Sequence, residues 1–317
     1  MTGPTITPWG TYGLLVLCTA FWGATLVVGE VAVEASGPMF VAAGRYLVAT
    51  VLLFGFLAGS RQRLTVRRGD LGWLALMGAV GVFGYNALYF LGLDYSTASH
   101  GALIGATPPV WTVLICALFL GERLTGRRIL GVVLGLAGVV LVLQATARSG
   151  HDRSDHMLLG DLFLLLAAIS WAVYSVLGRR VLTRYSPSQV TAWASLFGTV
   201  MFLPVVALLP RPPVDRMFSP VVLLSIGFLA VFSTVVAFVL WNRGVAAIGA
   251  SQTAIFLNLE PVWGLVLAMV LLHQTVTPLQ LGGALLVLVA VFVMQRTGGK
   301  ARTTSLEDRR DTVGRRR

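Results

Sequence analysis

The amino-acid sequence predicts an all-α integral membrane protein, with ten transmembrane helices in two inverted five-helix repeats around a central cavity. Composition, ten apolar runs and an internal duplication carry this prediction. The chain has 317 residues, is 56% hydrophobic and only 12% charged, with a mean hydropathy of +0.82. A soluble domain carries about 25% charged residues. The chain therefore lacks the polar surface that it would need to cover itself in water.

The chain holds ten apolar runs that suit membrane spans. A helix needs about 17–25 mostly apolar residues to cross a bilayer. Turn-forming and charged residues separate the runs, as at Ser36-Gly37-Pro38 and Arg211-Pro212-Pro213. We expect spans near residues 12–33, 38–58, 70–92, 97–120, 128–144, 158–179, 188–209, 219–242, 249–272 and 276–295.

Two halves of the chain nearly repeat each other. Around the fourth and ninth spans the offset is 152 residues, and around the first two spans of each half it is 149. The matching positions are Pro109-Val110-Trp111 with Pro261-Val262-Trp263, Gly131 with Gly283, Trp22 with Trp171, and Pro38 with Pro187. Five spans per repeat is an odd number, so the second repeat must cross the membrane in the opposite direction to the first. We expect the first repeat at 12–145, the second at 158–296, and a basic cytoplasmic tail at 297–317.

The positions of the basic residues predict the orientation. All but Lys300 of the 24 basic residues are Arg. Eleven fall in the loops after the second, fourth, sixth and eighth spans, against four in the alternate loops. Cytoplasmic loops are enriched in Lys and Arg, so we expect a multi-pass protein of the inner (cytoplasmic) membrane with both termini in the cytoplasm. The basic tail suits anionic lipid headgroups, and no folded module beside it points to nucleic acid.

Prolines near the middle of the fourth and ninth spans mark the expected substrate site. Pro108, Pro109 and Pro261 remove backbone donors and kink a helix, which frees carbonyl groups. Such groups are tolerated at membrane depth only against protein or a water-filled cavity. Transporters place their substrate sites at broken helices of this kind. The alternative is a packing kink with no role in binding.

Glu260 is the only acidic residue deep in a predicted span. An ionised carboxylate there costs several kcal/mol unless it is paired. We expect Glu260 to couple transport to protons or to bind a substrate amine; the alternative is a structural salt bridge. The matching position in the first repeat is Pro108, so the carboxylate is present in one repeat alone.

Arg45 and His100 are further candidates for polar contacts inside the membrane. Arg45 could hold a substrate carboxylate through two hydrogen bonds, or it could pair with Glu30, Glu34 or Asp94. His100, one turn into the fourth span, is either a polar cavity contact or an interfacial histidine.

Four further mid-span residues are expected at the substrate site or between helices. Trp22 and Trp171 lie at equivalent positions, where they could form aromatic cavity walls or pack helices together. Asn86 and Asn258 could bridge helices or contact substrate.

Other residues fit structural roles. Aromatic residues near span ends favour the membrane interface, and small residues allow close approach of helices. The first group is Trp9, Tyr89 and Trp241; the second is Gly78, Gly81, Gly84, Gly131, Gly135 and Gly138.

The sequence indicates no cofactor and no metal ion. Cys18 and Cys116 lie in apolar runs and suggest neither a disulfide nor a thiol metal site. The polar segment His151–His156 has ligand residue types, but polar linkers of this type are common. A membrane-embedded enzyme would need paired His and carboxylate residues within spans, and a channel would need repeated filter elements. The four histidines are scattered and no such pairing occurs in the sequence, while a channel remains a weaker alternative to a transporter.

Several motifs together resemble one known family. They are Phe21-Trp22-Gly23, Pro38 with Arg45, Pro108-Pro109-Val110, Gly121-Glu122-Arg123-Leu124, the glycines of the fifth span, and Pro261-Val262. Across residues 12–296 the chain resembles the EamA-type family of the drug/metabolite transporter superfamily. His273-Gln274 replaces the family's Gly-Glu in the second repeat.

The resemblance implies a fold and a function. Spans one to four and six to nine would surround the cavity, with spans five and ten outside. The implied function is secondary transport of a small metabolite, an amino acid or related compound, outward by alternating access. The expected partners are this small-molecule substrate, the lipid bilayer and protons as a candidate coupling ion. The chain would act as a monomer or a homodimer, and the alternatives are a membrane-embedded enzyme or a channel.

Overall fold

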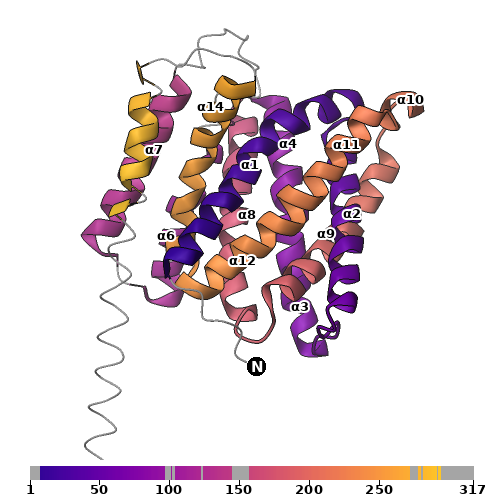
Figure 1. Cartoon of the computed structure of the whole chain (residues 1–317), viewed down its shortest axis with the longest axis horizontal. Helices are drawn as coiled ribbons and strands as arrows, with labels where there is room; N and C mark the ends of the chain where they lie inside the picture. Colours follow the sequence, from indigo (N-terminus) through magenta and orange to yellow (C-terminus); the bar gives the residue numbers. More distant parts are fainter. Residues whose placement is uncertain are drawn as a thin grey trace, which may run out of the picture.

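The structure is a computed structural model, and its regular elements are helices (Figure 1). The described residues are 8–96, 101, 104–122, 124–144, 157–271, 278, 279, 281–290, 292 and 293. Within these ranges no β-strand occurs.

In the described part of the first half, six α-helices and one π-helical segment have assigned bounds. Gly37, with φ of 78°, turns the chain before Pro38 starts α2, and Gly121, with φ of 64°, ends α6. Glycine adopts these angles without strain, and proline suits a first helical position. The elements are α1 (Pro8–Ser36), α2 (Pro38–Gly59), α3 (Arg68–Met77), η1 (Gly78–Gly84), α4 (Tyr85–Tyr95), α6 (Pro108–Leu120) and α7 (Gly126–Gln144).

The second half follows a similar order and includes the further short elements α10, α13 and η3. Ser186 and Gln189 form a reciprocal capping box that starts α9. The elements are α8 (Met157–Val181), α9 (Pro187–Leu208), α10 (Val214–Met217), α11 (Pro220–Phe228), η2 (Leu229–Val236), α12 (Ala237–Ile248), α13 (Ala250–Ala254), η3 (Ile255–Leu259) and α14 (Glu260–Leu271). Residues 281–290 are also helical.

The bounds of these elements recur at the offsets found in the sequence. α2 and α9 begin 149 residues apart, and α6 and α14 begin 152 apart. The α3–η1–α4 and α11–η2–α12 helices both contain a π-helical segment in the same place. Thr50 and Thr199, which occupy matching positions, share a hydrogen bond of 3.2 Å between α2 and α9. The duplication therefore extends from residue types to local backbone structure.

Five described helices are long and apolar enough to cross a membrane, and α6 and 281–290 are shorter apolar helices. Apolar side chains also cover the outside; Leu118 and Phe119, for example, are each 78% exposed. Lipid can solvate such a surface, whereas water cannot. The protein is therefore a multi-pass membrane protein. The five long helices are Pro38–Gly59, Arg68–Tyr95, Met157–Val181, Pro187–Leu208 and Pro220–Ile248.

The helices at the expected fourth and ninth spans are interrupted rather than kinked. Thr107 precedes a new helix that begins at Pro108. In the second half, the 3-10 segment η3 separates α13 from α14, whose second residue is Pro261. Proline lacks the N–H that a continuing helix needs, but it fits the first turn of a new one. The expected simple kinks are thus replaced by helix starts inside the bundle.

Glycines bring the helices close together, as the sequence predicts. A methyl group on Gly78 would overlap the carbonyl oxygen of Ala194 in α9, and one on Gly81 would overlap the Tyr174 ring of α8. Gly138 of α7 meets the backbone of Gly283 in the same way. Figure 1 shows α7 and the helix at 281–290 side by side at one edge of the bundle.

The contact between Gly78 and α9 predicts that Gly78→Ala destabilises the protein. The added methyl group overlaps backbone atoms that cannot move alone, and overpacking of this kind costs about 1–3 kcal/mol. Gly55→Ala in α2 is the matched control, since nothing lies within 4 Å of its Cβ position. Thermal unfolding in detergent should show a lower midpoint for Gly78→Ala alone. Equal midpoints for both variants would contradict this packing.

Candidate functional site

The start of α14 lies inside the bundle, directly against α1. A Cβ atom on Gly23 of α1 would overlap Trp263 and approach the carbonyl oxygen of Glu260. The absence of a side chain at Gly23 therefore lets α1 reach the first turn of α14. Glu260 is the first residue of that helix.

Glu260 has no hydrogen-bond or ion-pair partner among the described residues. It is surrounded by protein, yet its side chain keeps intermediate exposure. Tyr85, Tyr89 and Cys18 are ionisable groups within electrostatic range of Glu260. The structural salt bridge considered from the sequence thus finds no partner in the described ranges.

Arg45 projects from α2 and has only neutral partners among the described residues. Its Nη2 donates to Asn86 Oδ1 at 2.8 Å and to the Tyr46 hydroxyl at 3.2 Å. Its Nε is buried without a partner in the described part. Glu34 and Asp94 are exposed, and neither forms an ion pair with Arg45. The side chain of Glu30 is not among those that the structure describes. Arg45 therefore keeps donors for an anion that these residues do not supply.

Tyr85 lies within electrostatic range of both Arg45 and Glu260. Its ring stacks on Tyr89, with centroids 6.0 Å apart and planes at 20°, and lies 5.3 Å from Trp171. Sequence reasoning missed Tyr85 and placed Tyr89 at the interface. The spacing of four residues on one helix was the available signal, because such residues share a face.

Trp22 and Trp171, the matching tryptophans of the two halves, touch each other. Their ring centroids are 5.2 Å apart at 86°. Trp22 Nε1 donates to the Ser233 carbonyl oxygen at 2.9 Å. Trp171 is only 5% exposed. The pair thus forms an aromatic contact between α1 and α8 next to Tyr85.

Trp241 lies in the same aromatic cluster, 5.4 Å from Trp22 and 5.7 Å from Trp171. It is fully buried, so its expected place at the membrane interface is wrong. Helix α12 turns this position toward α1 and α8, where a large ring fills the core. Trp9, at 73% exposed, is free to take an interfacial position.

The two mid-span asparagines have different surroundings. Asn86 is buried; it accepts from Arg45 and donates to Val82 O at 2.6 Å and to the Tyr46 hydroxyl at 3.3 Å. Asn86 therefore orients Arg45. Asn258 packs against Gly135 of α7, and its amide has no hydrogen-bond partner in the described part.

Three predictions made from the sequence lie outside the described residues: those for His100, for the segment 151–156 and for the basic tail at 297–317. Among the residues that are described, no group of three or more His, Cys, Asp or Glu is placed to hold a metal ion.

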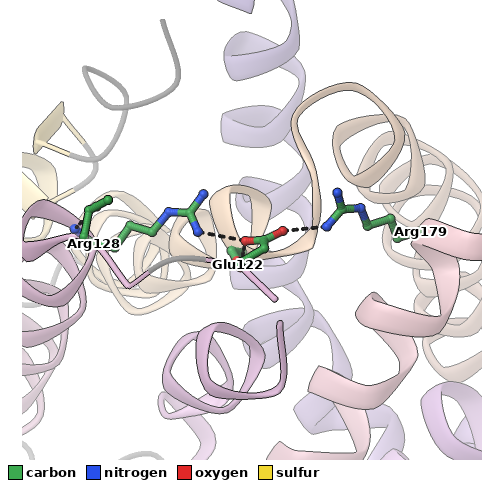
Figure 2. A network of polar contacts seen from close by, with 5 residues as sticks. Glu122, Arg128 and Arg179 are labelled. Atoms are coloured by element: carbon green, nitrogen blue, oxygen red, sulfur yellow. Dashed lines mark hydrogen bonds and ion pairs between the residues drawn. The ribbon is translucent and has the colours of Figure 1, made fainter. Parts of the chain in front are cut away.

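Glu122, which follows α6, joins the three helices α7, α8 and α13 at one end of the bundle (Figure 2). Its carboxylate accepts from Arg128 of α7 at 2.8 Å, from Arg179 of α8, and from the Ser251 hydroxyl of α13 at 2.9 Å. Two charge-assisted bonds and a hydroxyl make this a strong contact. The sequence motif containing Glu122 gave no sign of this role, because Arg179 and Ser251 come from the other half of the chain.

Comparisons with known proteins agree with this architecture. A family model described as "EamA-like transporter family" matches residues 9–144 and again residues 158–296. An "Uncharacterized transporter YyaM" of Bacillus subtilis (strain 168) is 32% identical over 287 residues, covering 88% of this chain and 92% of that protein. A "Probable terminal-alkyne amino-acid exporter" of Streptantibioticus cattleyicolor is 31% identical, covering 93% of this chain and 97% of that protein.

More distant relatives and a solved structure extend the comparison. A "Probable amino-acid metabolite efflux pump" of Escherichia coli (strain K12) is 25% identical, covering 88% of this chain and 93% of that protein. One solved crystal structure superposes with a TM-score of 0.80 at 20% identity, covering 92% of this chain and 98% of that one; this likeness concerns the fold alone. The two matches of the family model and the named relatives agree with the motifs in the sequence: the chain belongs to the EamA-like transporter family, and it is a multi-pass membrane transporter of small molecules rather than an enzyme.

Proposed function

We propose that the protein exports an amino acid or a closely related zwitterion across the cytoplasmic membrane by alternating access. The observation that carries this proposal is the pair Arg45 and Glu260. Both lie near Tyr85 inside the bundle, and neither meets an opposite charge among the described residues. A zwitterionic substrate carries both a carboxylate, which would pair with Arg45, and an ammonium group, which would pair with Glu260.

Each charged group of such a substrate has a suitable protein group. Arg45 presents a planar fork that matches a carboxylate through two parallel hydrogen bonds, and Asn86 holds it in place. Glu260 is an acceptor for a substrate ammonium group. Trp22 and Trp171, with Tyr85 and Tyr89, supply aromatic walls for the rest of the molecule.

Two further contacts predicted from the sequence, His100 and Asn258, enter this proposal differently. His100 stays a predicted polar contact from the fourth span. For Asn258, the packing against Gly135 supports the helix-bridging alternative over substrate contact.

Ten spans in two inverted repeats around a central cavity complete the proposal. Its support is the recurrence of helix bounds at offsets of 149 and 152, together with the paired interruptions before α6 and α14. Rocking of one repeat against the other would then expose the site to each side in turn. Outward transport is supported by the relatives named as exporters and efflux pumps.

The test of the proposal is transport by the purified protein in liposomes. A panel of amino acids, amines and carboxylic acids is offered with and without a pH gradient. We expect transport of at least one zwitterion and weaker transport of its singly charged analogues. Transport of none of the zwitterions by active protein would refute the proposal.

Arg45→Lys should impair transport of the identified substrate. Lysine keeps the positive charge but loses the planar fork, and a lost charge-assisted hydrogen bond corresponds to about a tenfold or larger rise in apparent KM. Arg61→Lys, at an exposed position after α2, is the control. Unchanged transport by Arg45→Lys would favour a simple charge-balancing role.

Glu260→Gln should abolish any dependence of transport on the pH gradient. Glutamine keeps the size but fixes the group in the neutral state, so it cannot carry a proton between the two sides. Glu34→Gln, an exposed acid on α1, controls for the loss of one negative charge. Wild-type transport without pH dependence would leave substrate binding as the role of Glu260. Normal transport by Glu260→Gln under every gradient would exclude both roles.

The orientation can be tested with single cysteines in a background that lacks Cys18 and Cys116. Thr65→Cys, between α2 and α3, should be protected from an impermeant thiol reagent in intact cells. Ser154→Cys, in the segment that joins the two halves, should be labelled, because the arginine distribution supports an external position for it. The opposite labelling pattern would invert the proposed topology.

A further inference from the structure

A cavity of about 480 Å³ lies between the α2–α3 connection and the segment that leads into α9. Six of the residues that line it are Arg63, Thr65 and Arg67 from the first half, and Arg184, Tyr185 and Gln189 from the second. In Figure 1 this end of the bundle, where α3 begins, lies opposite α10.

The cavity carries excess positive charge. Arg184 is paired with Asp70 at 2.8 Å, and the Tyr185 hydroxyl donates to the other carboxylate oxygen. Arg63 and Arg67 are exposed and have no carboxylate partner in the described part of the chain. The cavity is thus lined by three arginines, and only Arg184 is paired with a carboxylate among the described residues.

The backbone that presents these arginines is held in place. Gln189 donates through its side-chain amide to the Arg63 carbonyl oxygen, and the Arg67 N–H donates to the Tyr185 hydroxyl at 3.0 Å. Asp70, which accepts from the same hydroxyl, is 9% exposed. The cavity is therefore a fixed frame in which the Arg63 and Arg67 guanidinium groups have no carboxylate partner among the described residues and can take a ligand.

Aromatic residues beside the cavity indicate its depth in the membrane. Trp193 donates to the carbonyl oxygen of Leu64, whose side chain is 39% exposed. The guanidinium of Arg180 lies 4.4 Å from the centre of the Trp73 ring. Tryptophans and arginines concentrate at the level of lipid headgroups, so this cavity opens at the membrane surface.

We propose that this cavity is a binding site for a phosphate group, carried by an anionic phospholipid headgroup or by a soluble phosphate compound. Arginine forks match phosphate oxygens through paired hydrogen bonds, and the Thr65 hydroxyl adds a further donor. Basic pockets between transmembrane helices bind anionic headgroups in this manner. The site is separate from Arg45 and Glu260, and a phosphate bound there touches both halves of the chain.

The test is a titration of the purified full-length protein in neutral detergent with phosphatidylglycerol, followed by native mass spectrometry. Phosphatidylcholine is the uncharged reference. The double variant Arg63→Gln/Arg67→Gln should weaken phosphatidylglycerol binding by about tenfold or more. These two positions are chosen because their side chains have no carboxylate partner among the described residues, while the Arg184–Asp70 pair stays intact. Arg63→Gln alone is a milder second variant, expected to weaken binding about threefold.

The matched control is Arg211→Gln/Arg216→Gln. It removes the same charge from exposed positions near α10, at the other end of the bundle, and should leave phosphatidylglycerol binding unchanged. A parallel arm adds inorganic phosphate at constant ionic strength. Competition with the lipid identifies soluble phosphate as a ligand, and its absence identifies the headgroup. Equal losses in both double variants, or no loss in either, would overturn the proposal, as would failure of both probes to bind.

Discussion

The cost of an unneutralised charge inside a membrane determines how this site is organised. A buried arginine or glutamate is expensive at membrane depth unless it meets an opposite charge or water. Arg45 donates hydrogen bonds to Asn86 and Tyr46, and both of these residues are neutral. Glu260 begins α14 without a partner among the described residues. Under the function proposed above, a bound zwitterion would offset both costs together, and the same two residues would provide affinity and select against singly charged molecules.

The backbone obeys a related constraint. Polar backbone groups must be satisfied within the protein at membrane depth, so helices can stop only where other protein surrounds the break. The two interruptions, before Pro108 and across residues 255–259, occur at matching positions within the bundle. Gly23 lets α1 pack against the second of them. At one end of the bundle, Glu122 holds elements from both halves together. Movement of one half against the other must therefore rearrange the Glu122 contacts.

The sequence predicted helix positions well and side-chain directions less well. The bilayer imposes a span length and an apolar composition, which is why the expected span at 38–58 and the observed α2 (Pro38–Gly59) nearly coincide. The rotation of each helix about its axis depends on its neighbours, which composition does not reveal. Trp241 therefore faces the core instead of the interface. Contacts between distant segments, such as Glu122 with Arg179, have no local signal at all.

The most direct test of the central claim compares the transported zwitterion with two analogues, one without the amino group and one without the carboxylate. Competition by each analogue is measured for the wild type, Glu260→Gln and Arg45→Gln. The account assigns the amine to Glu260 and the carboxylate to Arg45. Glu260→Gln should then lose discrimination only against the analogue without an amino group. Arg45→Gln should lose discrimination only against the analogue without a carboxylate. Equal loss of discrimination against both analogues in each variant would contradict the assignment of one charge to each residue.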